Sequence, residues 1–468
     1  MENRTGSWGN LRILFKSALI GALILLLLIP TTFIQNLVSE RQQRQQEAVT
    51  EINSRWAGPQ TIDGPIIGIP YMDTTAADNG AKQRIKRWAW FLPEKLDIRS
   101  RLVPEKRYRG IYQVVVYTAE MEIHARYDAI HLDELNLSPQ DMLWNEAAVF
   151  FNLSDVQGLN EDPVLHLQIT GPAPQSADLH LALGKVTNPQ FKDPLSAPLP
   201  GGLSAFSAND ATTGNGSLEF SSTLRIKGSG NLLFVPGGRE TRISASSSWS
   251  NPSFTGAALP DLRTIKDSGF LASWRLLALN RKFPQQWKGD KDSYDLGASA
   301  FGVDLIVPVD IYQQTTRSVK YGILVILLTF TAFLLIEWIY NLLIHALQYA
   351  LVGFALCIFY TLLLSLSEYL GFTPAYLIAA AATIGLIAWY VGSLLHSLRM
   401  SSFISFLLIL QYGFVFILIQ SQDYALLMGS VGLFVILAVV MYFSRKVKWE
   451  QSPSPPDNPA PAGKSLWD

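Results

Sequence analysis

The feature that most constrains this 468-residue chain is an almost continuously apolar stretch in its last third. A hydrocarbon core about 30 Å thick is crossed by about 20 apolar residues in a helix. We expect five such helices, at Tyr321–Tyr340, Gln348–Leu366, Ala375–Val391, Phe403–Gln420 and Ala425–Phe443. The sequence therefore predicts a membrane protein whose residues 321–443 form a C-terminal bundle of five transmembrane helices.

One more apolar segment lies near the start, at Ile13–Ile34. A cleavable signal has an apolar region of about 7–15 residues followed by a small-residue cleavage site. Here the polar residues Gln35 and Asn36 follow the apolar segment, and no Ala-x-Ala site is present. We therefore expect an uncleaved signal-anchor helix at 13–34, preceded by a short N-terminal segment at 1–12.

Lys and Arg residues in short flanking segments predict the orientation of the six spans, because cytoplasmic loops are enriched in them. They precede the first span and follow the fourth and sixth spans, at Arg4, Arg12, Lys16, Arg399, Arg445, Lys446 and Lys448. Both termini, 1–12 and the proline-rich tail 444–468, are thus expected in the cytoplasm. In a bacterium this is a multi-pass inner-membrane protein with residues 35–320 in the periplasm.

The exported region 35–320 is polar, and it lacks cysteine, so no disulfide holds it together. Alternation and β-branched residues predict strands at Gly64–Tyr71, Arg109–Tyr127, Val164–Gly171, Ser217–Lys227, Asn231–Val235, Thr241–Trp249 and Phe301–Tyr312. Short helices are expected at Ser39–Arg55 and Ser138–Phe151. Many short strands with Gly and Pro turns favour a β-rich (α+β) domain, either an antiparallel sandwich or two packed sheets.

One segment of this domain, Lys82–Arg109, is strongly basic and contains interleaved aromatic residues. The candidate basic contact face consists of Arg84, Lys86, Arg87, Arg99, Arg101, Arg107 and Arg109. Such a face would bind anionic lipid headgroups, an envelope polymer or another envelope protein. The alternative is a solvated surface that acids elsewhere in the domain balance. The formal net charge of −1 argues against a nucleic-acid partner.

The sequence lacks the motifs of common catalytic and metal sites. Neither Gly-x-Ser-x-Gly nor His-Glu-x-x-His occurs. The best cation candidate, Gly289–Asp295, has three closely spaced carboxylates but lacks the glycine and the terminal glutamate of a calcium loop. An ordinary polar turn is therefore favoured there. We expect no catalytic residue, no cofactor and no metal site.

The predicted spans contain few ionisable residues. Glu337 and Glu368 lie near span ends, whereas ion-coupled transporters usually place carboxylates at the midplane. If the helix continued past Tyr340, Glu337, His345 and Gln348 would share one side. Such a polar side usually packs against neighbouring helices through hydrogen bonds. The alternative is a ligand or proton site between the second and third spans.

Several segments resemble the CreD family of inner-membrane proteins, also described as colicin-tolerance proteins. The similar segments are Arg109–Glu120, Phe270–Arg275, Phe283–Trp287, Phe301–Tyr312 and His345–Glu368. One departure is Val115, which stands where the family pattern leads us to expect proline. The resemblance implies a role in envelope integrity under cell-wall stress and supplies no catalytic residues.

Two functions are consistent with these patterns. The preferred one is a non-catalytic inner-membrane protein that maintains envelope integrity through its periplasmic β-rich domain. The alternative is a small-molecule exporter or lipid flippase that uses the polar faces of the second and third spans. A membrane enzyme ranks last, because only the carboxylates of residues 289–295 favour it.

Overall fold

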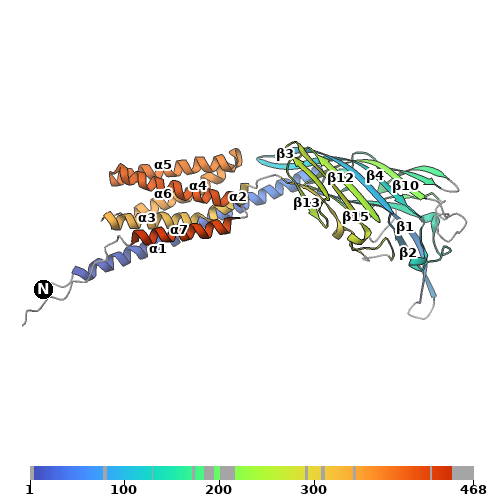
Figure 1. Ribbon diagram of the computed structural model, residues 1–468, viewed down its shortest axis with the longest axis horizontal. Coiled ribbons are helices and arrows are strands. Elements are labelled where there is room, and N and C mark those ends of the chain that lie inside the picture. The colour runs from blue at the N-terminus through green and yellow to red at the C-terminus, as the bar shows by residue number, and fades with distance from the viewer. Residues whose placement is uncertain are drawn as a thin grey trace, which may run out of the picture. The chain divides into compact units, whose positions relative to one another are not determined.

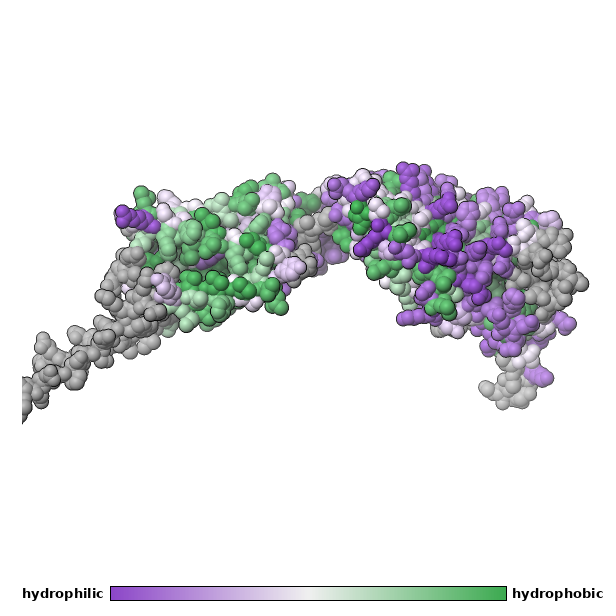
Figure 2. Space-filling view, viewed as in Figure 1, coloured by the Kyte–Doolittle hydropathy of each residue, from purple (hydrophilic) through white to green (hydrophobic). Residues whose placement is uncertain are grey.

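The protein consists of two compact units, residues 1–44 with 309–468 and residues 45–308. The computed structural model describes residues 5–76, 82–128, 130–170, 174–183, 194–200, 217–289, 294–306, 311–340, 344–421 and 424–444. The first unit is helical and the second is built of strands (Figure 1). Hydrophobic residues cover most of the visible surface of the helical unit, whereas hydrophilic residues dominate that of the strand unit (Figure 2).

The helices follow the predicted apolar segments. They are α1 (Thr5–Arg55), α2 (Ile311–Lys320), α3 (Gly322–Tyr340), α4 (Ala346–Leu370), α5 (Phe372–Leu395), α6 (Leu398–Gln420) and α7 (Ala425–Ser444). Six helical segments in the described part of the chain are long and apolar enough to cross a membrane, which confirms the six predicted spans. The predicted helix at Ser39–Arg55 is also confirmed, as the continuation of α1.

Close packing in the helical unit depends on small and aromatic residues. A side chain at Gly353 of α4 would meet Leu27 of α1 at 2.3 Å and Phe330 of α3 at 2.9 Å. This glycine therefore lets three helices approach closely, as small residues do in membrane bundles. Between α4 and α6, the rings of Phe359 and Tyr412 are 4.6 Å apart. The α7 helix differs from the other spans, because no residue in its most apolar stretch is buried in the protein.

In the described residues of the second unit, seventeen strands form two sheets. The nine-stranded sheet contains β1 (Gln60–Ala76), β2 (Lys82–Phe91), β5 (Ala148–Leu153), β8 (Ala182–Leu183), β9 (Leu195–Pro198), β11 (Asn231–Phe234), β13 (Pro252–Gly256), β16 (Gln286–Lys288) and β17 (Phe301–Leu305). Its order is β13-β17-β11-β1-β5-β9-β8, with β2 pairing to both β1 and β16.

The eight-stranded sheet contains β3 (Lys95–Arg109), β4 (Tyr112–Tyr127), β6 (Val164–Thr170), β7 (Gln175–His180), β10 (Ser217–Ser229), β12 (Glu240–Ser247), β14 (Leu262–Lys266) and β15 (Gly269–Leu277). Its order is β14-β15-β12-β3-β4-β10-β6-β7. Pairing is antiparallel except between β3 and β12 and between β1 and β11. These two sheets confirm the predicted β-rich class.

The main core lies between the two sheets. Alternate residues of β3, such as Leu96 and Ile98, are buried in it together with Ile67 of β1. A second cluster lies on the other face of the nine-stranded sheet and contains Trp90 and Phe150. Because successive side chains of a strand point to opposite faces, β1 supplies residues to both cores.

Two sequence predictions are wrong in this unit. The helix expected at Ser138–Phe151 is replaced by a short 3-10 turn at Trp144–Glu146 and by β5. Nearly all of β5 is buried, and a short buried apolar run cannot be told from a helix by periodicity. The strand expected at Phe301–Tyr312 is too long, because β17 ends at Leu305 and α2 begins at Ile311.

Candidate functional site

Four adjacent strands of the eight-stranded sheet present polar side chains on the face opposite the core. On β3, Leu96, Ile98, Ser100 and Leu102 point inward, so Arg99 and Arg101 point outward. Two rows cross β12, β3, β4 and β10 in register: Ser246, Arg101, Glu120 and Arg225, and then Ser244, Arg99, Glu122 and Thr223. Basic and acidic residues thus alternate across the sheet.

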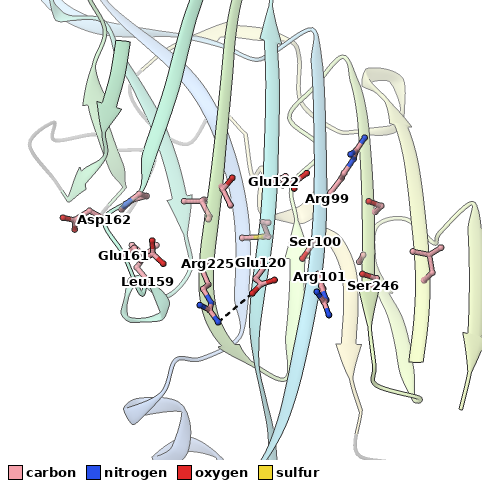
Figure 3. A pocket seen from close by; sticks show the side chains of 17 residues that line it. Arg99, Ser100, Arg101, Glu120, Glu122, Leu159, Glu161, Asp162, Arg225 and Ser246 are labelled. Atoms are coloured by element: carbon pink, nitrogen blue, oxygen red, sulfur yellow. Dashed lines mark ion pairs between the residues drawn. The ribbon is translucent and has the colours of Figure 1, made fainter. Parts of the chain in front are cut away.

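The loop that precedes β6, residues 159–163, borders these rows on one side. The Asn160 amide donates a hydrogen bond to the Arg225 carbonyl at 3.4 Å, and Leu159 forms an isolated bridge with Ile226. The rows and the loop enclose a cavity of about 560 Å³, which we call the sheet groove. Glu161 and Asp162 line it from the loop, opposite the arginine side chains of β3 (Figure 3).

The charges in the sheet groove are only partly compensated by one another. Arg225 forms an ion pair with Glu120 at 3.8 Å (Figure 3). Arg99 and Arg101 form no ion pair within 4 Å with any carboxylate in the described ranges. Both guanidinium groups are exposed and line the groove, so they can donate hydrogen bonds to a ligand.

The other five candidates of the basic face lie elsewhere and are paired with acids. The pairs are Arg84 with Asp141, Lys86 with Glu146, Arg87 with Asp73, Arg107 with Glu105 and Arg109 with Glu51. Arg84, Lys86 and Arg87 belong to β2, in the nine-stranded sheet. The structure therefore does not bring the seven residues together, and it singles out Arg99 and Arg101.

The aromatic residues interleaved with this basic segment are mostly structural. The Trp88 and Trp90 rings stack at 5.5 Å within the second core.

Sequence reasoning missed Glu120, Arg225 and the 159–163 loop as part of the site. The alternation of charged and apolar residues along Tyr112–Tyr127 and Ser217–Ser229 was the available signal, because it marks an outer face.

The sheet groove combines arginines with carboxylates and with hydroxyl groups of serine and threonine. Guanidinium groups recognise carboxylate and phosphate oxygens, and the remaining lining can hydrogen-bond hydroxyl or amide groups. The lining has three guanidinium groups and four carboxylates, so it suits a polar ligand that carries anionic groups together with hydroxyl or amide donors. In the described residues no set of three His, Cys, Asp or Glu side chains is arranged to hold a metal.

The predicted cation candidate at 289–295 lies mostly outside the described residues, which exclude 290–293. Of its carboxylates, Asp295 is described. It accepts a hydrogen bond at 3.1 Å from the amide of Ala298, in the 3-10 turn Gly297–Ser299.

Both carboxylates singled out in the spans have partners within the helical unit. Lys16 of α1 donates a hydrogen bond to Glu337 of α3, and the Tyr349 hydroxyl donates to the same carboxylate at 3.0 Å. Glu368 of α4 lies 3.8 Å from Arg41 of α1. These contacts join residues on different helices, as polar groups in membrane bundles commonly do.

His345 and Gln348 are not on the helix that carries Glu337. The α3 helix ends at Tyr340, and α4 begins at Ala346, with His345 immediately before it. The single polar side expected for a continuous helix therefore does not form. Instead, the His345 amide donates a hydrogen bond to the Gln348 side chain at 2.9 Å, which caps the start of α4.

Six apolar spans and a two-sheet polar domain define a polytopic membrane protein with one large domain in a chain segment between the first and second spans. The family model for the inner membrane protein CreD matches residues 12–450. The inner membrane protein CreD of Escherichia coli K12 is 32% identical over 436 residues, which cover 92% of each chain. The chain belongs to the CreD family of inner membrane proteins.

Proposed function

We propose that this protein is a non-catalytic component of the bacterial envelope whose β-rich domain binds an anionic envelope constituent in the sheet groove. The observation that carries the proposal is the pair of guanidinium groups of Arg99 and Arg101, which face the groove and form no ion pair among the described residues. An exposed arginine without an acidic partner is available to a carboxylate or phosphate of a ligand. Binding there would help maintain envelope integrity.

The proposal includes an orientation. We infer that both termini are cytoplasmic and that residues 35–320 face the periplasm, because the flanking Lys and Arg residues favour it. Cysteines introduced as Ser176→Cys in β7 and His396→Cys between α5 and α6 test it, since the native Cys357 is buried. In intact cells an impermeant maleimide is expected to label position 176 and to spare position 396. The reverse pattern overturns the orientation.

The binding test compares two double variants of the full-length protein. Arg99→Gln with Arg101→Gln removes two positive charges from the groove, and Arg84→Gln with Lys86→Gln removes two from β2 as a matched control. Purified protein in detergent is sedimented with isolated cell-wall sacculi or with phosphatidylglycerol vesicles.

We expect the groove variant to lose at least five-fold in binding to one of these probes while the control binds as the wild type does. Charge-assisted hydrogen bonds from two arginines account for a loss of this size, at about 1 kcal/mol or more in total. Equal binding by both variants overturns the groove as the site. The groove variant is also expected to fail in complementing a deletion strain under cell-wall stress.

The alternative of an exporter or flippase relied on the polar residues of α3 and α4. We propose structural roles for Glu337 and Glu368 instead. Lys16 of α1 and Tyr349 of α4 contact Glu337, and Arg41 of α1 and Tyr312 of α2 contact Glu368. The test is complementation of the deletion strain by Glu337→Gln or by Glu368→Gln. Complementation at the wild-type level is expected, and its loss in a variant that is normally expressed would favour a transported ion at that carboxylate.

A further inference from the structure

The helical unit contains a large apolar cavity that has no part in the function proposed above. It lies between α3, α6 and α7 and has a volume of about 940 Å³. Its walls include Leu328 and Ala332 of α3, Phe403 and Leu407 of α6, and Val435 and Val439 of α7. We call it the helix cavity. Its size is within the range of cavities that hold organic ligands in proteins.

The α7 helix has little of its surface buried in the bundle, but it approaches α6 closely at one residue. A side chain at Gly432 would lie 2.1 Å from the Phe414 ring, so α7 meets α6 closely at this glycine. The residues of α7 that line the cavity all lie from Gly432 to Val440, in the middle and C-terminal part of the helix. Val435 and Val439 are about half exposed, so the cavity is open to the surrounding lipid.

One end of the cavity is polar. Arg399 and Ser397, at the start of α6, line it there. Since α3, α4, α5 and α6 cross the membrane in alternating directions, the start of α6 lies at the same membrane surface as the end of α3. Ile336, next to Glu337, lines the cavity as well. Arg399 is therefore placed at the interface, where lipid phosphates lie.

The charge at this end is unbalanced. Among the described residues, no acidic side chain lines the cavity and no carboxylate forms an ion pair with Arg399. From Arg399 to Val415 the lining on α6 extends about 24 Å at 1.5 Å per residue. This exceeds half of a hydrocarbon core of about 30 Å, so an acyl chain anchored at the interface can lie along it.

We propose that the helix cavity is a binding site for one anionic phospholipid. An acyl chain of the lipid lies between α3, α6 and α7, and its phosphate contacts Arg399. A net negative headgroup is favoured over a zwitterionic one, because the lining offers a guanidinium group and no carboxylate for an ammonium group. The site is independent of the sheet groove, so it stands or falls separately from the proposed function.

The test measures lipid retention by the full-length protein. Wild type and variants are reconstituted with equal amounts of phosphatidylglycerol and phosphatidylcholine, extracted into mild detergent, and analysed for bound lipid by native mass spectrometry. The wild type is expected to retain phosphatidylglycerol about five-fold over phosphatidylcholine. One basic residue near the membrane surface contributes about 1 kcal/mol, which corresponds to that ratio.

Two variants separate the headgroup from the acyl chain. Arg399→Gln is expected to abolish the preference, whereas Lys320→Gln, which removes a charge from the end of α2, preserves it. Ala332→Trp fills the cavity and is expected to lower retention of both lipids, whereas Leu437→Trp, on α7 outside the lining, is not.

Three results overturn the proposal. They are a preference that survives Arg399→Gln, retention that Ala332→Trp does not lower, and a dimer cross-linked through α7 in the bilayer, which would make a second copy the occupant. Variants are compared only after they elute as monodisperse protein in detergent. If Ala332→Trp fails this criterion, Val439→Trp fills the same cavity from α7 and replaces it.

Discussion

Lys16 of α1 forms an ion pair with Glu337 of α3, across 321 positions of the sequence. A second ion pair joins Arg41 of the same helix to Glu368 of α4. From Lys16 to Arg41 the helix rises by 25 residue steps, or about 37 Å. This length lies between the hydrocarbon thickness of about 30 Å and the full bilayer thickness of about 40–45 Å. The two pairs therefore attach α1 to the bundle at both membrane interfaces.

The Lys16–Glu337 pair gives the first prediction. Glu337 is 5% exposed, so removing Lys16 leaves a buried carboxylate without its counter-charge. We expect Lys16→Met to lower the free energy of unfolding by roughly 1–3 kcal/mol, because a buried pair near the interface retains some access to water. Adding Glu337→Gln to Lys16→Met should restore part of this loss, which a double-mutant cycle in detergent measures.

The Arg41–Glu368 pair supplies the control for this cycle. Its atoms are 3.8 Å apart and the Arg41 side chain is 38% exposed, so the pair should contribute less than about 1 kcal/mol. Strictly additive effects of Lys16→Met and Glu337→Gln would contradict a direct interaction between them.

The second prediction concerns Arg281, which holds the connection between the two sheets. Its guanidinium donates hydrogen bonds to the carbonyls of Pro236 and Gly237, at 2.9 and 2.6 Å, and to the Gln285 side chain. Gln285 in turn donates to the carbonyl of Pro93, in the segment that crosses from β2 to β3. Burial, with a smaller effect of the Arg239 charge, lowers the pKa of Arg281 to about 10.

We expect Arg281→Ala to cost roughly 3 kcal/mol in unfolding free energy, because two buried carbonyls and the Gln285 side chain lose a charged donor. Arg281→Lys should recover less than half of it, since an ammonium group cannot reproduce the planar fork of donors. Denaturant unfolding followed by tryptophan fluorescence measures both. The exposed Arg263 of β14 is the reference, and a loss of the same size on Arg263→Ala would refute the explanation.

The segment Phe283–Trp287 illustrates which features of the fold can be predicted from the sequence. The segment resembles the family pattern, and in the structure Phe283 and Trp287 pack in the second core while Gln285 links the two sheets. Hydropathy predicted all six spans because lipid imposes a single-helix length on each. Strand order escaped prediction, since pairings such as β3 with β12 join residues that are far apart in the sequence.

The same limit explains the candidate sites. Glu337 and Glu368 were noticeable because charges are rare in apolar spans, but their partners lie on α1, far away in the sequence. Which arginines of 82–109 remain unpaired depends on acids such as Asp141 and Glu146, which the fold alone brings near β2. Local patterns therefore identified candidate residues, and the three-dimensional fold decided their contacts.

The third prediction concerns Gly68 at the centre of β1. A Cβ atom there would lie 2.7 Å from ring atoms of both Phe150 and Trp90, which pack in the second core. Gly68→Ala should therefore cost about 1–3 kcal/mol through overpacking. Gly58→Ala is the matched control, because its nearest neighbour is the Asp155 carboxylate at an ordinary 3.5 Å. Thermal unfolding of both variants decides the point, and equal stability would count against tight packing at Gly68.

The fourth prediction concerns pH and rests on Asp63 of β1. This residue is 4% exposed, and its Oδ1 atom has no hydrogen-bond partner among the described residues. The nearby Tyr127 hydroxyl donates to the Pro65 carbonyl instead. Burial therefore raises the pKa of Asp63 from 3.8 to about 7.

The sign follows from proton binding in the two states. Between about pH 4 and pH 7 the folded protein retains the Asp63 proton and the unfolded chain does not, so stability falls as pH rises through this window. A difference of about three pKa units corresponds to about 4 kcal/mol. Above pH 7 both states are ionised and the loss is complete.

Asp63→Asn keeps the shape of the protonated acid and cannot ionise. The variant should match the wild type near pH 4 and exceed it by up to about 4 kcal/mol at pH 8. Subtracting the stability-versus-pH curve of the full-length variant from that of the full-length wild type cancels the contributions of the other titrating groups. Asp178→Asn, on the exposed strand β7, should give a far smaller difference. A wild-type-minus-variant curve that stays flat from pH 4 to pH 8 would mean that Asp63 ionises alike in both states, and that its burial carries no cost.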